Sequence, residues 1–169
     1  MNFSCRLDSL VGPLTVVSDE SAVTAVRFGG FVTDGVVLAG PTDDSAWPEV
    51  LRQAVRQLTE FFAGERRTFT VPLAPAGTPF QRQVWRALQT IPYGATCSYR
   101  DIACAVGRPA ACRAVGMANH CNPLPIFIPC HRVVGADGRL TGYAGGLAIK
   151  SRLLQFEREH GGKFLSQPV

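Results

Sequence analysis

The feature of this sequence that most constrains its fold is a change of pattern near residue 77. Before this point, alternating apolar residues such as Leu14 and Val16, and a second short stretch at 23–28, are separated by turn residues and predict a β-hairpin. After it, capping residues, prolines and glycines mark the start and end of one helix after another. Strands followed by helices predict the α+β class, with one small domain over residues 1–76 and a second over 77–169.

Residues 1–76 are predicted to form a small antiparallel β-sheet with one helix, in a structural role. The helix is expected from Pro48, because four apolar residues share one face and Gly64 can end it. Those residues are Leu51, Val55, Leu58 and Phe62. The segment 69–71 is expected to be a last strand before a linker, whereas residues 31–47 give no clear prediction.

Residues 77–169 are predicted to be mainly helical. Thr78-Pro79 provides a capping oxygen followed by a proline in the first turn, and apolar residues then recur at four-residue spacing. A capping box at 98–101 predicts a helix over 98–106, and Pro109 is expected to start another that runs to about Asn119. A last amphipathic helix of about three turns is expected between Leu147 and Phe156.

The helices at 98–106 and 109–119 have the proportions of a helix-turn-helix. The second carries Arg113 among small residues, which would let the helix approach another surface while the arginine reaches into a groove. The small residues are Ala110, Ala111, Ala114 and Ala118. The same alanines would equally suit packing against neighbouring helices, so this pattern alone leaves DNA binding open.

Charge is divided unevenly along the chain. The formal net charge is +4, but residues 1–79 carry −3 and residues 80–160 carry +6. A basic half next to an acidic half suits a polyanionic partner, although a solvated basic face has the same composition. With 46% hydrophobic and 18% charged residues, the chain can build a core, which excludes a disordered protein.

The sequence shows no membrane span and no secretory signal, because its apolar runs are short and its N-terminus lacks a basic start before an apolar stretch. We therefore expect a cytoplasmic protein. The six cysteines, at positions 5, 97, 104, 112, 121 and 130, include no C-x-x-C pair. This argues against a zinc ribbon or a thioredoxin-like site, and disulfides are not expected inside the cell.

Residues 122–134 contain the one thiol whose neighbours suggest chemistry. Residues 126–128 are predicted to form a short buried strand between prolines, with Cys130 where the strand gives way to a loop. A rigid apolar support that ends at polar residues is a suitable mount for a reactive atom. A free thiol titrates near pH 8.5, so a nucleophilic Cys130 needs a nearby base, for which His131 is the candidate. A core cysteine beside a surface histidine would give the same pair.

Pro129-Cys130-His131-Arg132 resembles the active-site signature of the O6-alkylguanine-DNA alkyltransferases, the methylated-DNA–protein-cysteine methyltransferases. The resemblance extends over about residues 77–160, where further segments follow the family in order and spacing. They are Gly77–Gln81 with Val84-Trp85, Ile91–Gly94, Ser98-Tyr99, Arg113–Gly116, Asn122-Pro123 and Tyr143–Gly146. The first 76 residues match the family only in their general character. The chain looks like the stand-alone, constitutive bacterial type rather than the adaptive-response regulator.

The resemblance implies direct-reversal DNA repair by a suicide methyltransferase. An alkyl group would move irreversibly from O6 of guanine in duplex DNA, and from O4 of thymine, to Cys130. His131 would take the thiol proton through a water molecule, and Glu157 would orient His131. Asn122 would be the hinge that ties the recognition helix to the active-site segment. Tyr99 would rotate the nucleotide out of the duplex and later help to neutralise the departing guanine.

The same resemblance implies the DNA-binding and pocket residues. Arg113 would enter the duplex in place of the flipped nucleotide, from a helix that also presents Ala114 and Gly116 and that uses the minor groove. Backbone groups of Cys130 and Val133 would read the guanine edge. The remaining pocket residues would be Pro125, Tyr143, Ala144 and Gly145.

The resemblance implies no cofactor. The structural zinc of some relatives needs ligands that the N-terminal half lacks, since it has only Cys5 and no histidine, so we predict no metal. Ala144 stands where some relatives have serine, so that only its backbone amide could serve O6. The expected partner is double-stranded DNA containing O6-alkylguanine, with no membrane and no obligate protein partner. We expect a monomer, and the sequence leaves open whether molecules cluster on DNA.

Two other functions share some of these features. A sensor that binds alkylated bases without repairing them would lack the acceptor, whereas this chain keeps Cys130, His131 and Glu157 together. A cysteine hydrolase would need an oxyanion site and would leave Tyr99 and Arg113 without a role. The sequence leaves open the preferred alkyl size and any role of the other five cysteines.

Overall fold

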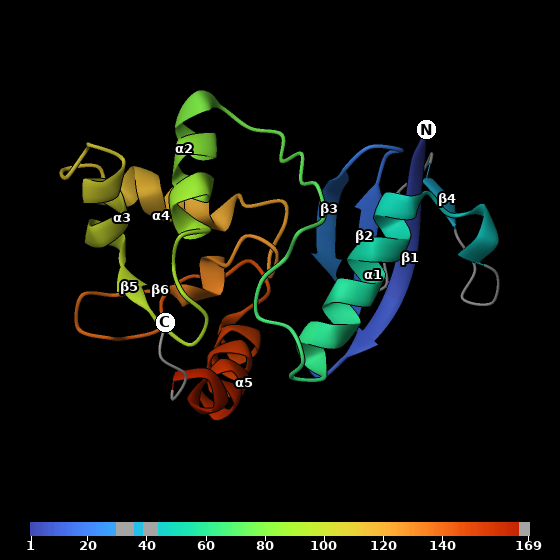
Figure 1. Ribbon diagram of the computed structural model, residues 1–169. Coiled ribbons are helices and arrows are strands. Elements are labelled where there is room, and N and C mark those ends of the chain that lie inside the picture. Colours follow the sequence, from blue (N-terminus) through green and yellow to red (C-terminus); the bar gives the residue numbers. More distant parts are fainter. Residues whose placement is uncertain (30–35, 39–43, 166–169) are drawn as a thin grey trace. The chain divides into compact units, whose positions relative to one another are not determined.

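The computed structural model describes residues 1–29, 36–38 and 44–165, which form two compact units, Met1–Ala76 and Gly77–Val169 (Figure 1). The first unit contains the sheet and one α-helix, and the second contains the remaining four α-helices of the described ranges. The predicted α+β class is confirmed. Much of the segment that gave no clear prediction (31–47), namely 31–35 and 39–43, lies outside the described residues.

The first unit is a four-stranded sheet with the order β3-β2-β1-β4. Its strands are β1 (Asn2–Ser9), β2 (Gly12–Ser18), β3 (Val23–Phe28) and β4 (Val36–Leu38). The first three are antiparallel, as predicted, and β4 pairs with β1 in parallel. After the 3-10 turn η1 (Asp44–Ala46), helix α1 (Glu49–Phe62) packs on β1, β2 and β3. Its fully buried residues Leu51, Leu58 and Phe61 form the core with Leu14 and Val16 of β2.

The segment 69–71 is not a strand, contrary to the prediction. The buried Gln57 of α1 takes the place of a neighbouring strand, because its Oε1 accepts hydrogen bonds from the backbone N–H groups of Thr70 (3.0 Å) and Val71 (3.3 Å). The chain reaches the sheet only at Leu73, which forms a single parallel bridge with Val23. The side chain of Gln57 thus satisfies the backbone N–H groups that a neighbouring β-strand would otherwise have paired.

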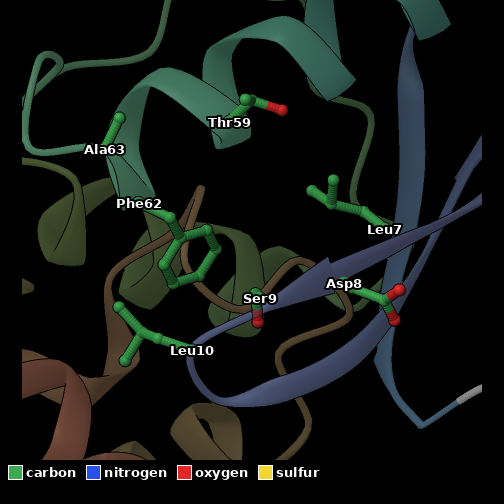
Figure 2. A pocket seen from close by; sticks show the side chains of 7 residues that line it. All are labelled: Leu7, Asp8, Ser9, Leu10, Thr59, Phe62 and Ala63. Carbon is green, nitrogen blue, oxygen red and sulfur yellow. The ribbon is translucent and has the colours of Figure 1, made fainter.

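The first unit also has a surface hollow of about 460 Å³ between the end of the β1–β2 hairpin and the end of α1 (Figure 2). Phe62 projects from α1 toward the hairpin, where Leu10 lies (Figure 2). The lining residues are Leu7, Asp8, Ser9, Leu10, Thr59, Phe62 and Ala63. None of them is a predicted site residue, since all of those lie in the second unit.

The second unit is mainly helical, and two of its helices, α2 and α3, begin at the caps that the sequence predicts. Its elements are α2 (Pro79–Leu88), β5 (Cys97–Ser98), α3 (Tyr99–Ala105), α4 (Cys112–His120), η2 (Cys130–Arg132), β6 (Val133–Val134) and α5 (Leu147–Leu165). Thr78 with Gln81, and Ser98 with Asp101, form complete capping boxes. Helices α2, α3 and α4 pack against one another. The indole Nε1 of Trp85 donates a hydrogen bond to the carbonyl of Ala118 (2.8 Å), which joins α2 to α4.

Two predicted helix limits are wrong. Helix α4 begins at Cys112 rather than Pro109, because residues 108–111 first form a turn in which the N–H of Ala111 binds the carbonyl of Arg108 (2.9 Å). Proline suits the second position of such a turn as well as the first turn of a helix. Helix α5 has 19 residues, well beyond the expected three turns. No helix in the described ranges is long and apolar enough to cross a membrane.

We predict that Gly77→Ala destabilises the second unit. A β-carbon at Gly77 would lie 2.7 Å from Cζ3 of Trp85 and 2.8 Å from Oε1 of Gln81. Because the Trp85 ring is fully buried, it cannot move aside without disturbing the core. Overpacking of this kind costs about 1–3 kcal/mol in the free energy of unfolding, measured by urea denaturation. Gly161→Ala is the control, since its β-carbon would come no closer than 3.8 Å to Gly94, and equal losses in both variants would contradict the prediction.

Candidate active site

Cys130 lies in the 3-10 turn η2, directly after a segment that asparagine side chains hold in place. Asn122 accepts a hydrogen bond from the N–H of Leu124 (2.9 Å) and donates one to the carbonyl of Ile128 (2.9 Å). Asn119, at the end of α4, donates to the carbonyl of Cys130 itself (3.3 Å). Cys130 is 3% exposed. The position of the thiol is therefore set by the end of helix α4.

The segment before Cys130 is a tight turn, not the predicted strand. Pro125 and Ile128 form an isolated bridge, and Ile126 between them has a φ of +77°. A β-branched residue in this left-handed region stores about 1–3 kcal/mol of strain. The apolar Ile-Phe-Ile pattern is nevertheless buried, as a strand would be, because all three side chains enter the core. The two Asn122 hydrogen bonds close the turn and hold this conformation.

His131 and Arg132 share one carboxylate, that of Glu157 on α5. Nε2 of His131 lies 3.0 Å from Oε1 of Glu157. Arg132 donates to both oxygens of the same carboxylate, at 3.0 Å from Nε and 2.6 Å from Nη2, and its Nη1 donates to the carbonyl of Ile91 (2.7 Å). His131 and Glu157 are fully buried. This cluster ties α5 to the turn that carries Cys130.

Burial and charge set the protonation states of this cluster. Burial raises the pKa of the Cys130 thiol to about 11, against the opposing effects of Asn122, Lys150 and Tyr143. Burial also lowers the pKa of His131, although Glu157 acts in the opposite direction. The pKa of Glu157 falls to about 2, because the hydrogen bonds and charges of His131 and Arg132 outweigh its burial. Near neutral pH the cluster therefore holds a thiol, a neutral imidazole and an ionised carboxylate.

A loop over residues 135–146 brings Tyr143 to Cys130. Tyr143 is buried, and its side chain acts on the thiol by lowering the pKa of Cys130 against the effect of burial. The loop is also tied to Tyr99 at the start of α3, whose hydroxyl donates to the carbonyl of Thr141 (3.3 Å) and accepts from its Oγ1 (3.0 Å). The ammonium of the fully buried Lys150 donates to the same carbonyl (2.8 Å).

The structure thus places Asn122 and Tyr143 at the Cys130 thiol and joins the neighbouring His131 to Glu157 in one buried cluster. Arg113 and Ala114 are exposed on α4 and lie outside this cluster, while Gly116 faces the ring of Tyr99, which a β-carbon there would meet at 3.9 Å. The other predicted pocket residues are placed as follows: Val133 pairs with Cys97, Pro125 is buried in the tight turn, and Ala144 and Gly145 lie in the turn that follows Tyr143.

Sequence reasoning missed two charged residues, Arg132 and Lys150. Arg132 belongs to the Pro-Cys-His-Arg motif, and it makes three hydrogen bonds to Glu157, more than His131 does. Lys150 precedes Glu157 by seven residues, so the two lie on the same face of a helix. This spacing was visible in the sequence. Among the described residues, no group of three or more His, Cys, Asp or Glu could hold a metal ion.

Comparison with known proteins gives the family. Residues 79–159 match the family described as "6-O-methylguanine DNA methyltransferase, DNA binding domain", and residues 6–75 match its "ribonuclease-like domain". The chain is 47% identical to a methylated-DNA–protein-cysteine methyltransferase of Methanosarcina acetivorans, covering 89% of this chain and 94% of the relative. It is also 47% identical to the constitutive protein of that name from Bacillus subtilis, covering 94% and 96%.

A solved structure agrees with these sequence matches. The crystal structure of Mycobacterium tuberculosis OGT in complex with DNA superposes with a TM-score of 0.83 at 43% identity, covering 94% of each chain. Fold and sequence therefore define an enzyme of DNA repair that transfers a methyl group from methylated DNA to a protein cysteine. The chain belongs to the methylated-DNA–protein-cysteine methyltransferase family.

We predict that Glu157→Gln destabilises the protein at neutral pH. The folded pKa of about 2 lies below the ordinary value of 4.5, so the carboxylate stabilises the fold fully above pH 4.5, and this contribution is lost as the pH falls through 2. The difference corresponds to about 3 kcal/mol at pH 7. Urea denaturation of wild type and variant should differ by about this amount at pH 7 and much less at pH 2.

The matched control is Glu159→Gln, which removes an exposed carboxylate from the same helix. We expect it to leave the free energy of unfolding within about 0.5 kcal/mol of wild type at both pH values. A loss in Glu157→Gln that is the same at pH 7 and pH 2 would show that the carboxylate charge is not what stabilises the cluster.

Proposed function

We propose that this protein repairs O6-alkylguanine in duplex DNA, and O4-alkylthymine as a second substrate, by moving the alkyl group irreversibly to Cys130 in a single turnover. The observation that carries the proposal is the buried assembly of a thiol, a neutral imidazole and an ionised carboxylate at Cys130, His131 and Glu157. This assembly has the groups that a thiol nucleophile needs: a base, and a third group that orients the base.

The proton of Cys130 leaves through His131. Because Nε2 faces the ionised Glu157, it carries the imidazole proton and donates a hydrogen bond to the carboxylate. Nδ1 is then the basic nitrogen, and it is buried without a hydrogen bond to any atom of the described residues. A water molecule between Nδ1 and the Cys130 sulfur would carry the proton. Glu157 stabilises the imidazolium that results.

The thiolate then attacks the alkyl carbon in line with the bond to O6. The sulfur–carbon bond forms as the carbon–oxygen bond breaks, and guanine leaves with the negative charge. The hydroxyl of Tyr143, the amide of Ala144 next to Gly145, and the backbone of Cys130 and Val133 would surround the base and stabilise that charge. Tyr99 would help to neutralise the departing guanine. Pro125 and Tyr143 would line the space for the alkyl group.

DNA binding uses the exposed face of α4. The target atom lies inside the base stack, so the nucleotide must rotate out of the duplex, at a cost of a few kcal/mol. Tyr99 would push on the phosphate, Arg113 would fill the space that the nucleotide leaves, and the small residues Ala114 and Gly116 would let α4 approach the minor groove. Asn122, which lies two residues after the end of α4 and holds the turn before Cys130, would act as the hinge between DNA recognition and alkyl transfer.

The proposed transfer inactivates each molecule of the protein. A thioether is a poor leaving group, so the alkyl group stays on the sulfur of Cys130. One transfer per molecule follows. We further propose that the protein acts in the cytoplasm as a monomer whose partner is DNA.

We predict that Cys130→Ala abolishes alkyl transfer but keeps DNA binding. The substitution removes the sulfur and leaves the exposed face of α4 unchanged. Fluorescence anisotropy with duplex DNA containing O6-methylguanine should give an affinity within about threefold of wild type, while transfer, followed by loss of O6-methylguanine from the DNA, should vanish. Cys121→Ala is the control, because Cys121 is an exposed thiol near the same helix and should retain full transfer. Transfer by Cys130→Ala would place the acceptor elsewhere.

We predict that Arg113→Ala slows repair of duplex DNA and spares the reaction with a free base. Arg113 is exposed and belongs to no contact at the thiol, so its loss removes only the group that would replace the flipped nucleotide. The rate constant on duplex DNA should fall at least about tenfold, whereas the rate with free O6-benzylguanine should change less than about threefold. Arg56→Ala, an exposed arginine on α1, should change neither rate. Equal losses on both substrates would exclude the proposed role of Arg113.

A further inference from the structure

Met117 is a large apolar side chain left in water on α4, the helix proposed to bind DNA. It is 62% exposed, and Leu147 on α5 is the other large apolar side chain that is exposed among the described residues of the second unit. A single exposed methionine on a protein surface would ordinarily need no explanation. The position of Met117 next to Arg113 gives it one.

Met117 lies on the outermost line of α4. The residues of this helix that enter the core are Val115, Ala118 and Asn119. With 3.6 residues per turn, Arg113 and Met117 are about 40° apart around the helix, and both point away from that core. Arg113 is exposed as well. The two side chains therefore leave the helix next to each other, about 6 Å apart along its axis.

Two neighbours of Met117 on this face are short. Ala114 is exposed and has only a methyl group, and the half-buried Gly116 has no side chain. Met117 lies between them around the helix, so its side chain extends well beyond the surface that they form. A helix that approaches DNA as closely as Ala114 and Gly116 allow cannot leave Met117 in solvent. The approach proposed for α4 therefore pushes Met117 into the DNA beside Arg113.

A thioether side chain suits the space beside a flipped nucleotide. Rotation of the nucleotide leaves unstacked bases, and proteins that bend the duplex from the minor groove often insert methionine or another apolar side chain between base steps. Methionine has no strong donor or acceptor to desolvate, and its flexible chain adapts to irregular gaps. Successive base pairs are about 3.4 Å apart, so an α4 that lies along the groove would place Met117 about two base pairs from Arg113.

The cations of the second unit cannot fill this role. Residues 80–160 carry a net charge of +6, and α4 contains no acidic residue, so this face attracts phosphates. Phosphate contacts hold and orient a duplex whether its base pairs are stacked or opened. An apolar contact with unstacked bases exists only once the duplex has opened. Met117 can therefore favour the opened state selectively.

We propose that Met117 is a second inserted group beside Arg113: its side chain packs against the bases that nucleotide rotation unstacks, and it thereby favours the flipped complex. This inference rests on the proposed function and extends it, because Arg113 would fill the place of the nucleotide itself and Met117 would cover the base step beside it. The partner of Met117 is the opened minor groove of duplex DNA, and Met117 takes no part in the chemistry at Cys130.

The test compares Met117→Ala, which removes the side chain, with Met117→Leu, which keeps it apolar, and Met117→Gln, which keeps its length and makes it polar. Single-turnover rate constants are measured at saturating protein on duplex DNA containing O6-methylguanine, on the same single strand, and on free O6-benzylguanine. On the duplex the rate should fall about fivefold in Met117→Ala and Met117→Gln and stay within about twofold in Met117→Leu. On the other two substrates every variant should stay within about twofold of wild type, because there is no duplex to open.

A fluorescent base reports on the insertion without any transfer. The adenine analogue 2-aminopurine brightens when it is unstacked, and it is placed about two base pairs from the O6-methylguanine. Binding of Cys130→Ala should raise its fluorescence, and adding Met117→Ala should reduce this rise by about half. Leu147→Ala is the control, because it removes an exposed apolar side chain from another helix. It should leave the ratio of the duplex rate to the free-base rate within about twofold of wild type.

Three outcomes would overturn the inference. They are a wild-type rate of Met117→Ala on the duplex, equal losses on the duplex and the free base, and a rate of Met117→Gln as high as that of Met117→Leu. Failure of the proposed function looks different, because wild type itself would then transfer no alkyl group from any of the three substrates. The 2-aminopurine signal would still show whether Met117 enters the duplex.

Discussion

The structure around the thiol depends on one buried carboxylate, that of Glu157. It accepts hydrogen bonds from Nε2 of His131 and from Nε and Nη2 of Arg132. The third guanidinium nitrogen of Arg132, Nη1, donates a hydrogen bond to the carbonyl of Ile91. This arrangement does two things at once. It holds helix α5 against the turn that carries Cys130, and it keeps the imidazole of His131 in the orientation that leaves Nδ1 free to accept a proton. A neutral side chain at this position would leave Arg132 as an uncompensated buried charge.

Two asparagines connect this rigid cluster to α4, the helix proposed to bind DNA. Asn119 is the last buried residue of α4, and Asn122 lies two residues after the end of the helix. Asn119 donates a hydrogen bond to the carbonyl of Cys130, and Asn122 donates one to the carbonyl of Ile128. A displacement at the end of α4 therefore moves the acceptor turn itself. We infer that reading the DNA and placing the sulfur are coupled through these two amides, and that the strained Ile126 is tolerated because the amides hold the turn closed.

Much of the fold and of the site could be predicted from the sequence, because caps and spacing are local signals. The capping boxes at Thr78 and Ser98 and the α+β class follow from such signals. The wrong predictions have one cause, because in each case the residue pattern is compatible with two structures. Pro109 suits a turn as well as a helix start, and an Ile-Phe-Ile run is buried equally well in a turn as in a strand. Lys150 was overlooked because a lysine on a helix is normally solvated; only tertiary packing shows that its face of α5 is the buried one.

The central claim is that Cys130 accepts the alkyl group, and the most direct measurement is the mass of the intact protein after incubation with excess duplex DNA containing O6-methylguanine, followed by peptide mapping. The account predicts the mass of one added methyl group, located on Cys130, with no further addition however long the incubation lasts. A methyl group on another residue, or binding to the damaged DNA with no gain in mass, would contradict it.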